Sequence, residues 1–259
     1  MNILISGILG HMGREVERLC LASYRDANLV CGVDYFAEEN AGGVYKSFDA
    51  VSRTEEIDCI IDFSHHSLTP ALLRFAVDNS IPVVLSTTGH TEEELAKIKE
   101  AAERIPIFHS GNMSLGVALL CELARTAAKT MQGAEIEIIE THHNRKIDAP
   151  SGTALMLANA IKEVRPEATT NLGRSGHGKR EPNEIGIHSV RMGNIVGIHE
   201  VIVATETQTI TLKHEAHTRA LFAEGAMCAA EFIIARDAGI YDMKSIVAGE
   251  KADAPEIVG

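Results

Sequence analysis

Residues 2–15 read NILISGILGHMGRE, and the fold that we expect for the first half of the chain follows from them. An apolar, β-branched run ends at Gly7, and Gly10 and Gly13 follow at equal spacing before a charged, helical stretch. This pattern is typical of a parallel-sheet strand that turns directly into a helix. Such a turn brings backbone N–H groups to a helix N-terminus, where they can bind a pyrophosphate.

The loop has the spacing G-x-x-G-x-x-G, so Leu9 occupies the position of the second glycine in the usual dinucleotide pattern. A tight turn that binds nothing is the alternative interpretation. Asp34 favours binding, because it ends the expected second strand where a carboxylate accepts hydrogen bonds from an adenosine ribose. An ordinary turn residue is the alternative for Asp34. Tyr35 stands where an arginine often receives a 2′-phosphate, which mildly favours NADH over NADPH.

The first half of the chain alternates short apolar runs with amphipathic stretches, as expected of a parallel sheet with crossover helices. The expected strands are 3–6, 29–34, 59–63, 83–87 and 106–109. The expected helices are 10–24, 67–79 and 91–104, and Thr91 and Glu94 have the spacing of a capping box. These elements predict an α/β domain with a Rossmann-like, doubly wound parallel sheet of five strands.

Polar segments follow three of these strands, at the edge where ligands of open α/β sheets bind. They are Asp62, Phe63 and Ser64; Ser86, Thr87, Thr88 and Gly89; and Ser110, Gly111, Asn112 and Met113. Each segment alone is ordinary turn chemistry. Their clustering at successive strand ends predicts a site for a nicotinamide and its substrate.

After Gly111 the pattern changes. We expect a helix over 115–131 and strands over 134–143, 185–191, 199–204 and 208–213, which predicts an α+β domain on a mixed or antiparallel sheet. The stretch 171–183 is rich in glycine and basic residues and is expected to be a mobile surface loop. An alanine-rich helix over 219–238 is expected to return to the first domain. We therefore expect one domain over 1–113 plus 219–259 and another over 114–218.

The most informative segment is ETHHNRKIDAPSGTA, residues 140–154. An apolar stripe with helical spacing begins after Ser151, so Ser151 is expected to cap a helix. The N–H groups of Gly152 and Thr153 would then bind an anion such as a carboxylate. Lys146 would hold a second negative group or deliver a proton.

His142 and His143 are candidates for acid–base chemistry, since imidazole titrates near neutral pH. A metal site is less favoured, because adjacent histidines on an extended chain point to opposite sides and Asp148 is a poor third ligand. A polar strand-to-helix loop is the plainest alternative. The remaining histidines of interest are interpreted one by one as surface or packing residues: His65, His66, His188, His199, His214 and His217.

The composition of the chain limits the classes of partner and the compartment that we expect. The chain has 24 Lys and Arg against 36 Asp and Glu, a net charge of −12, which disfavours nucleic acid and anionic membranes as partners. Five cysteines without a C-x-x-C pair indicate reduced thiols and predict a cytoplasmic protein. No signal peptide or membrane anchor is expected. A small-molecule ligand held by a local site fits these properties.

The motifs resemble those of the 4-hydroxy-tetrahydrodipicolinate reductase (dihydrodipicolinate reductase) family. The family string E-x-H-H-x-x-K-x-D-x-P-S-G-T-A occurs without a break at residues 140–154. Further family motifs recur in order at 7–14 (G-x-x-G-x-M-G-R), 87–89 (T-T-G), 189–193 (S-V-R-x-G) and 195–197 (I-V-G). Leu9 and Ser86 stand where the family commonly has glycine.

The resemblance implies hydride transfer from NADH or NADPH to the ring of a cyclic dicarboxylate, with loss of its 4-hydroxyl as water. His142 would be the acid–base residue and Lys146 the proton donor. The implied substrate-binding residues are His143, Ser151, Gly152, Thr153 and Thr88. The implied cofactor-binding residues are Gly7, Ile8, Leu9, Gly10, His11, Met12, Gly13, Asp34, Ser86, Thr87, Thr88, Ser110, Gly111, Asn112 and Met113. The resemblance also implies a homotetramer built through the sheet of the second domain. The second domain would also bind the substrate.

Three other functions remain open from the residues alone. A Rossmann-type reductase for another small acid is one, although no cysteine lies where a thiol nucleophile would be needed. A nicotinamide-binding sensor without turnover is another, and it would not require His142 or Lys146. An oligomeric scaffold is the third, and it would bind no nucleotide.

Overall fold

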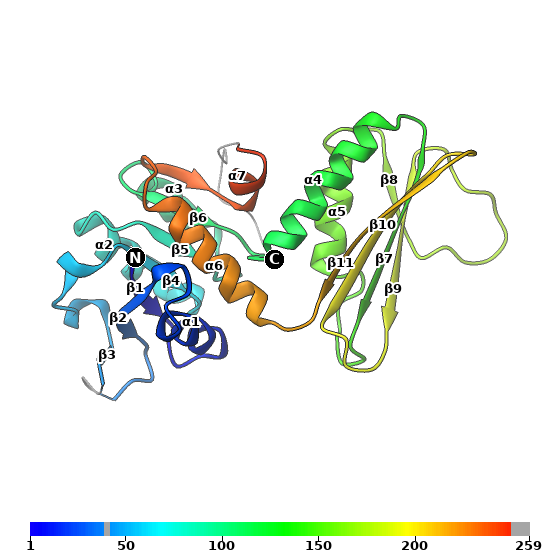
Figure 1. Cartoon of the computed structure of the whole chain (residues 1–259). Coiled ribbons are helices and arrows are strands. Elements are labelled where there is room, and N and C mark those ends of the chain that lie inside the picture. Colours follow the sequence, from blue (N-terminus) through cyan, green and yellow to red (C-terminus); the bar gives the residue numbers. More distant parts are fainter. Residues whose placement is uncertain (39–41, 250–259) are drawn as a thin grey trace. The chain divides into compact units, whose positions relative to one another are not determined.

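A computed structural model of the chain describes residues 1–38 and 42–249. The chain forms two compact units, of which the first comprises Met1–Ser114 and the segment that starts at Ala220, and the second comprises Leu115–Arg219 (Figure 1). Residues 250–259, which belong to the first predicted domain, lie outside the described residues. Within the described ranges, no helix is long and apolar enough to cross a membrane.

The first unit is built on a seven-stranded, wholly parallel sheet with the order β12-β6-β5-β4-β1-β2-β3. Its strands are β1 Asn2–Ser6, β2 Asn28–Val33, β3 Val44–Tyr45, β4 Cys59–Asp62, β5 Val83–Leu85, β6 Pro106–His109 and β12 Gly239–Tyr241. Its helices are α1 His11–Leu21, α2 Thr69–Asp78, α3 Glu92–Ala101, α6 Ala220–Ile233 and α7 Met243–Val247, with short 3-10 turns η1 Tyr24–Asp26, η2 Phe48–Ala50, η3 Thr54–Glu56 and η4 His66–Leu68.

The sheet confirms the predicted doubly wound class, but the predicted strand number of five is wrong. The two missed strands, β3 and β12, are two and three residues long, too short for apolar periodicity to reveal. β12 also comes from the far end of the chain, where α6 ends at Ile233 rather than at the predicted 238. The predicted capping box is confirmed, since Thr91 and Glu94 cap α3 reciprocally.

Helices cover both faces of this sheet. Leu72 of α2 and Ile98 of α3 join Leu4 and Ile60 in one buried core. On the opposite face α6 packs against α1 and against strands β4, β5 and β6, which confirms its expected return to the first unit. The carboxyl ends of β1, β2, β4, β5 and β6 therefore meet at one edge, where open α/β sheets bind ligands.

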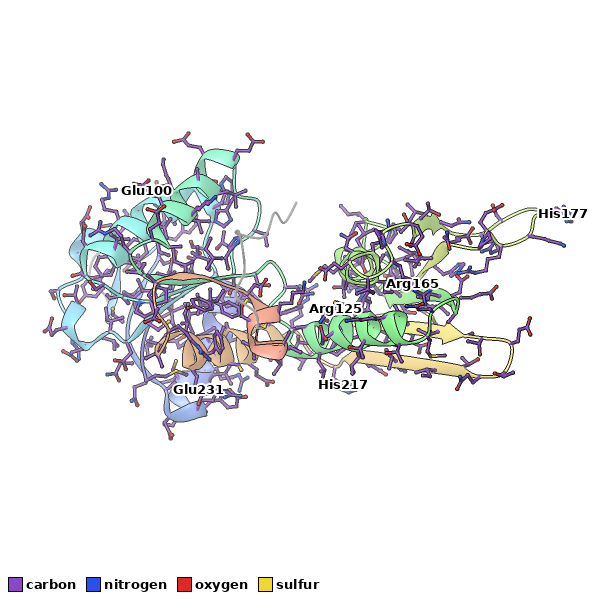
Figure 2. The ribbon with its side chains drawn as sticks, turned by 90° about the horizontal axis from the view of Figure 1, so that it is seen from above. Glu100, Arg125, Arg165, His177, His217 and Glu231 are labelled. Carbon is purple, nitrogen blue, oxygen red and sulfur yellow. The ribbon has the colours of Figure 1, made fainter. Side chains whose placement is uncertain are left out.

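The second unit has a mixed sheet with the order β11-β10-β7-β9-β8, antiparallel from β11 to β7 and parallel from β7 to β8. Its strands are β7 Glu135–His142, β8 Thr169–Leu172, β9 Glu184–Arg191, β10 Gly197–Ala204 and β11 Thr209–Ala216, and its helices are α4 Leu115–Thr130 and α5 Gly152–Lys162. The loop predicted over 171–183 is wrong at its start, because β8 continues to Leu172. This strand is polar and exposed, so it lacks the expected apolar pattern. His177 lies at the loop's outer end (Figure 2).

Strand β7 positions the site through its alternation. Ile136, Ile138, Glu140 and His142 are all buried on one face, with the residues between them more exposed. Ile136 and Ile138 belong to the core that α4 and α5 cover. The same face therefore changes along the strand from apolar core to two buried polar side chains.

Arg165, just beyond α5, holds this helical layer together (Figure 2). Its guanidinium donates to the carbonyl oxygens of Ala128 at 3.0 and 2.9 Å, of Met131 at 2.6 Å and of Ala134 at 2.7 Å. The last carbonyls of a helix have no partner within the helix, and a cation there also suits the helix dipole. One side chain thus joins the C-terminal end of α4 to the segment after α5.

We predict that Arg165→Met lowers the free energy of unfolding by about 2–4 kcal/mol, because it leaves several half-buried carbonyl groups without a donor. Lys129→Met is the matched control, since Lys129 lies on the exposed side of α4 and should change stability by less than about 0.5 kcal/mol. Urea unfolding followed by circular dichroism measures both. Equal effects in the two variants would contradict this role of Arg165.

Candidate functional site

The glycine loop of the first unit connects β1 to α1 through a very close backbone approach. A Cβ atom at Gly13 would lie 2.1 Å from the carbonyl oxygen of Gly7, so only glycine fits at position 13. No side chain caps α1 among the described residues, whereas Thr91 caps α3 and Ser151 caps α5. The N-terminus of α1 is therefore open to an anion.

Asp34 lies beside this loop and closes it from the end of β2. One carboxylate oxygen, Oδ2, accepts the N–H of Leu9 at 3.0 Å, and Oδ1 accepts the N–H of Phe36 at 3.0 Å. Leu9 thus takes part through its backbone while its side chain is exposed, so a leucine fits where the usual pattern has glycine. Among the other loop residues Ile8 is buried in the core, His11 is exposed and Met12 is half-buried.

A pocket of about 460 Å³ opens next to Asp34. Its lining includes Val33, Tyr35, Lys46, Phe48 and Leu68, and it thus has an apolar floor with one cation. Adenosine groups of dinucleotides bind at this side of the glycine loop in doubly wound folds. Lys46 comes from the segment after β3, a strand that the sequence did not reveal.

A buried carboxylate organises the next strand ends. Asp62 is fully buried and accepts the hydroxyl groups of Thr87 and Ser64, each at 2.6 Å, as well as the N–H of Ser64 at 3.2 Å. The Thr87 hydroxyl therefore ties the segment after β5 to β4, while Thr88 is exposed. The hydroxyl of Ser86 is buried without a partner in the described part of the chain.

The segment after β6 belongs to the same edge. Ser110 and Met113 are buried, and the side-chain oxygen of Asn112 accepts the N–H of Ser114 at 3.0 Å. The structure thus brings the predicted residues Ser86 to Thr88 and Ser110 to Met113 to neighbouring strand ends, since β5 pairs with β6.

His109, the last residue of β6, is buried, and within the described residues neither ring nitrogen has a hydrogen-bond partner. Burial and the nearby His90, whose ring lies 5.3 Å away, lower the pKa of His109 to about 4. His109 was not among the predicted site residues. An apolar run gives no sign that its final histidine is enclosed.

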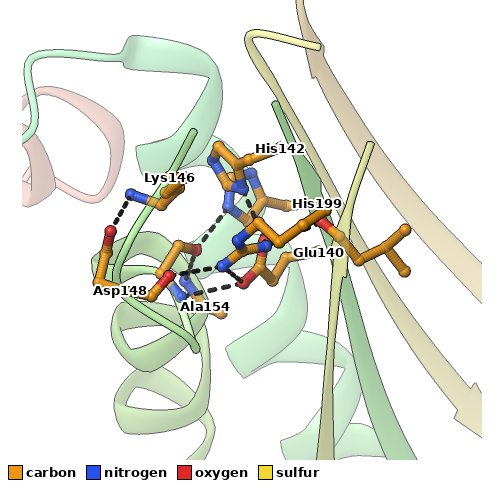
Figure 3. A network of polar contacts seen from close by, with 9 residues as sticks. Glu140, His142, Lys146, Asp148, Ala154 and His199 are labelled. Carbon is orange, nitrogen blue, oxygen red and sulfur yellow. Dashed lines mark hydrogen bonds and ion pairs between the residues drawn. The ribbon is translucent and has the colours of Figure 1, made fainter. Parts of the chain in front are cut away.

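In the second unit, Glu140 is the centre of a polar network (Figure 3). Its side chain is fully buried, and Oε2 lies 2.6 Å from Nδ1 of His142. Arg191 of β9 donates to both carboxylate oxygens, at 2.8 and 2.7 Å. The N–H of Ser151 donates to Oε1 at 3.0 Å.

These partners determine the charge of Glu140. Burial alone would raise the pKa of this carboxyl, but hydrogen bonds from His142, Arg191, Ser189 and Ser151 outweigh it and hold the pKa well below its ordinary value. Glu140 is therefore an ionised carboxylate that can only accept hydrogen bonds. Nδ1 of His142 must then carry the proton in their short contact.

His199 of β10 lies on the other side of His142, with ring centroids 5.1 Å apart. Its Nε2 is 3.1 Å from the hydroxyl of Ser151, and its Nδ1 is buried without a partner in the described residues. Burial, and then the neighbouring His142, lower the pKa of His199 to about 4, so the ring is neutral at pH 7. Interpreting His199 as an isolated packing residue misses this role in the network.

Helix α5 begins as predicted, since the Ser151 hydroxyl accepts the N–H of Ala154 at 3.3 Å. Gly152 at its first turn is exposed, and Thr153 is half-buried. The N-terminus of α5 therefore faces outward next to His142 and His199 and suits a carboxylate.

Lys146 and His143 lie in the loop between β7 and α5. The ammonium group of Lys146 is 2.8 Å from Asp148, and this contact lowers the pKa of the Asp148 carboxyl. Burial and the nearby cation Arg145 lower the pKa of the His143 imidazole. The backbone N–H of His143 donates to the carbonyl oxygen of Ile195 at 2.8 Å. Asp148 thus pairs with Lys146, and no group of three metal-ligating side chains occurs within residues 1–38 and 42–249.

The second unit therefore gathers His142, Lys146 and the N-terminus of α5 at one end of its sheet. Sequence reasoning missed three members of this network: Glu140, Arg191 and His199. The available signals were a glutamate and a histidine in phase with the apolar face of β7, and the arginine of the S-V-R-x-G motif at 189–193.

We predict that Gly13→Ala lowers dinucleotide affinity at least about tenfold and stability by about 1–3 kcal/mol, because the new methyl group forces the loop away from Gly7. Gly178→Ala is the control, since a Cβ there meets nothing within 4 Å. Calorimetric titration with NADH measures the affinity. Unchanged NADH affinity in Gly13→Ala would contradict the placement of the cofactor on this loop.

We also predict a pH-dependent loss of stability from His109 and His199. Both pKa values lie near 4 in the folded chain, against 6.5 without the fold, so the unfolded chain binds more protons between these values. Stability therefore falls as the pH drops from 6.5 towards 4, by up to about 1.4 kcal/mol per pH unit and histidine. His109→Phe should remove one such contribution from the pH dependence of urea unfolding. An unchanged slope would show that His109 does not titrate in this way.

Comparisons with known proteins agree with this geometry. Residues 1–113 match the family description "Dihydrodipicolinate reductase, N-terminus", and residues 116–247 match "Dihydrodipicolinate reductase, C-terminus". A 4-hydroxy-tetrahydrodipicolinate reductase of Caldanaerobacter subterraneus subsp. tengcongensis is 45% identical over 249 residues, covering 95% of this chain and 98% of that protein. The enzyme of the same name from Clostridium novyi is 41% identical with the same coverage.

A solved structure shows the same fold. Dipicolinate-bound dihydrodipicolinate reductase from Paenisporosarcina sp. TG-14 superposes with a TM-score of 0.81 at 24% identity, covering 95% of this chain and 99% of that one. The two matched halves, the close relatives and the shared fold lead to one conclusion. The chain belongs to the dihydrodipicolinate reductase family.

Proposed function

We propose that this protein reduces 4-hydroxy-tetrahydrodipicolinate to tetrahydrodipicolinate with NAD(P)H, in the diaminopimelate route of lysine biosynthesis. The observation that carries the proposal is the folded segment 140–154, which places His142, Lys146 and the N-terminus of α5 together (Figure 3). Relatives that cover most of the chain are named for this reaction.

The first unit would hold the cofactor. The open N-terminus of α1 and the close turn at Gly13 fit a pyrophosphate, and Asp34 fits the adenosine ribose. The exposed Thr88 and the segment Ser110–Met113 lie at the strand ends that would position the nicotinamide. When bound, the nicotinamide supplies the hydride.

The second unit would hold the substrate, a ring with two separated carboxylates. The N–H groups of Gly152 and Thr153 would bind one carboxylate at the N-terminus of α5, and Ser151 would fix that helix end. Lys146 and His143 offer the next polar groups. The chain has a net charge of −12, which repels anions at long range. A ligand with two negative charges must therefore be held by local N–H groups and cations.

The net reaction consumes one hydride and one proton and releases the 4-hydroxyl as water. Lys146 would donate the proton to the ring, and His142 would act as the acid–base residue. Nδ1 of His142 is held by Glu140, so Nε2 is the atom that would exchange a proton with the substrate.

We propose that both NADH and NADPH are accepted. Tyr35 offers no charge to a 2′-phosphate, but Lys46 lines the pocket beside Asp34 and can pair with one. Asp49, also in the lining, limits the gain from Lys46.

Lys46→Met should therefore raise the KM for NADPH by about two- to fivefold, as expected for an exposed ion pair, and leave that for NADH unchanged. Steady-state kinetics with each cofactor measures both constants, and Lys162→Met on the second unit serves as control. A parallel change for the two cofactors would argue against contact between Lys46 and the 2′-phosphate.

We further propose a cytoplasmic homotetramer assembled through the sheet of the second unit. All five cysteines are free thiols, which fits a reducing compartment. The face of this sheet opposite α4 and α5 carries the half-exposed side chains Ile139, Ile198 and Ile202, which suit burial against another copy.

The function is tested by following NADH and NADPH oxidation with enzymatically generated 4-hydroxy-tetrahydrodipicolinate. We expect turnover with the wild type and a loss of about tenfold to ten-thousandfold in His142→Ala and in Lys146→Ala, the usual range for an acid–base group. Wild-type rates in both variants would refute their roles. If neither cofactor is oxidised but the protein still binds a dinucleotide, a sensor or a different substrate would be favoured.

A further inference from the structure

The interior of the second unit contains an ionised carboxylate, Glu140, whose side chain is fully buried. A buried charge is costly unless it is paired and fully hydrogen-bonded. Arg191 supplies the opposite charge as a two-pronged partner, with contacts of 2.8 and 2.7 Å to the two oxygens. Glu140 and Arg191 are 51 residues apart in sequence, so the pair exists only because β7 and β9 are neighbours.

The same carboxylate fixes the ring of His142. Both side chains lie on one face of β7, two residues apart, and the contact at 2.6 Å holds the proton on Nδ1. Gly197 on β10 keeps the far side of the ring clear, since a Cβ there would lie 3.1 Å from Nε2. Glu140 therefore determines which nitrogen of His142 is the basic one.

The carboxylate also fixes the neighbouring anion site. Its Oε1 accepts the N–H of Ser151, the residue whose hydroxyl caps α5. Movement of Glu140 would thus shift both His142 and the helix N-terminus that faces the substrate.

Arg191 extends the network to the loop of Lys146. Besides the two contacts with Glu140, its guanidinium donates to the carbonyl of Asp148 at 2.6 Å. Asp148 in turn holds the ammonium group of Lys146 at 2.8 Å. One ion pair therefore connects both residues that would handle protons.

We propose that Glu140 and Arg191 are the positioning residues of this reaction: Glu140 sets the tautomer and orientation of His142, and Arg191 cancels the carboxylate charge and anchors the Lys146 loop. This inference rests on the function proposed above. Neither residue needs to touch the substrate. Without Arg191, an uncompensated carboxylate would lie close to a dianionic ligand.

The chain offers a matched control on the same strand. Glu137 also contacts a histidine and an arginine, His188 at 2.9 Å and Arg180 at 3.1 Å, but on the opposite face of β7. Glu137→Gln and Glu140→Gln therefore remove the same charge from one strand and from similar partners. Only the second replacement faces His142.

We expect Glu140→Gln to lower kcat by about 10- to 1,000-fold with little change in the KM for NADH, since the amide keeps the shape but loses the charge that orients the ring. The kcat–pH profile should differ from that of the wild type, because the charged oxygen that contacts Nδ1 of His142 is lost. The other charged or titratable side chains of the network around His142 are Glu140, His199, Lys146 and Arg191. Glu137→Gln should match the wild type in kcat and profile.

Arg191→Lys supplies a second test, since lysine keeps the charge but not the two-pronged contact. We expect it to raise the substrate KM and lower kcat together, while dinucleotide affinity is unchanged. Glu140→Gln and Arg191→Lys with wild-type kcat and wild-type pH profiles would overturn the proposal. The proposal would also be overturned if the loss of kcat in both variants were no larger than the fraction of unfolded protein in each sample.

A measurement without substrate separates this inference from the proposed function. Nitrogen NMR of the histidine rings, assigned with His142→Gln, reports the tautomer in the free protein. We expect His142 protonated on Nδ1 in the wild type and in Glu137→Gln, with a mixed population in Glu140→Gln. Protonation on Nε2 alone at neutral pH in the wild type would overturn the inference even if turnover is found. The expected tautomer without turnover would instead refute the proposed reaction.

Discussion

The contact between Glu140 and its partners constrains the whole second unit. A buried carboxylate must accept hydrogen bonds from several directions. The donors to Glu140 come from β7, β9 and the start of α5. The order of the sheet and the position of α5 are therefore tied to the satisfaction of one charge. The apolar half of the same face, around Ile136 and Ile138, supplies the packing that keeps this charge from water.

The first unit applies the same principle at its own sheet edge. Asp62 is fully buried at the end of β4 and is satisfied by Thr87 and Ser64 from the adjoining loops. In both units a buried acid near the end of a strand holds the segment that follows a strand or precedes a helix. Rigid positioning of this kind lowers the entropy that binding would otherwise cost. It also leaves the exposed groups, such as Thr88 and Gly152, free to meet ligands.

Local patterns made part of this structure predictable. The strand, glycine loop and helix of residues 2–21 follow from apolar periodicity and glycine spacing, and Ser151 follows from its place before a helical stripe. Strands β3, β8 and β12 were missed, since they are too short or too polar to show a period. Arg191 and His199 were missed for another reason. Their partnership with Glu140 is created by strand register, which no local pattern encodes.

We propose the N-terminus of α5 and His142 as the site of a ring with two carboxylates. A crystal structure with oxidised cofactor and pyridine-2,6-dicarboxylate, a planar mimic of the substrate, would show whether the ring binds there. We expect one carboxylate on the N–H groups of Gly152 and Thr153, the pyrophosphate on the loop at Gly13, and the ring beside Nε2 of His142. A dicarboxylate bound elsewhere, with His142 and the α5 terminus unoccupied, would contradict it.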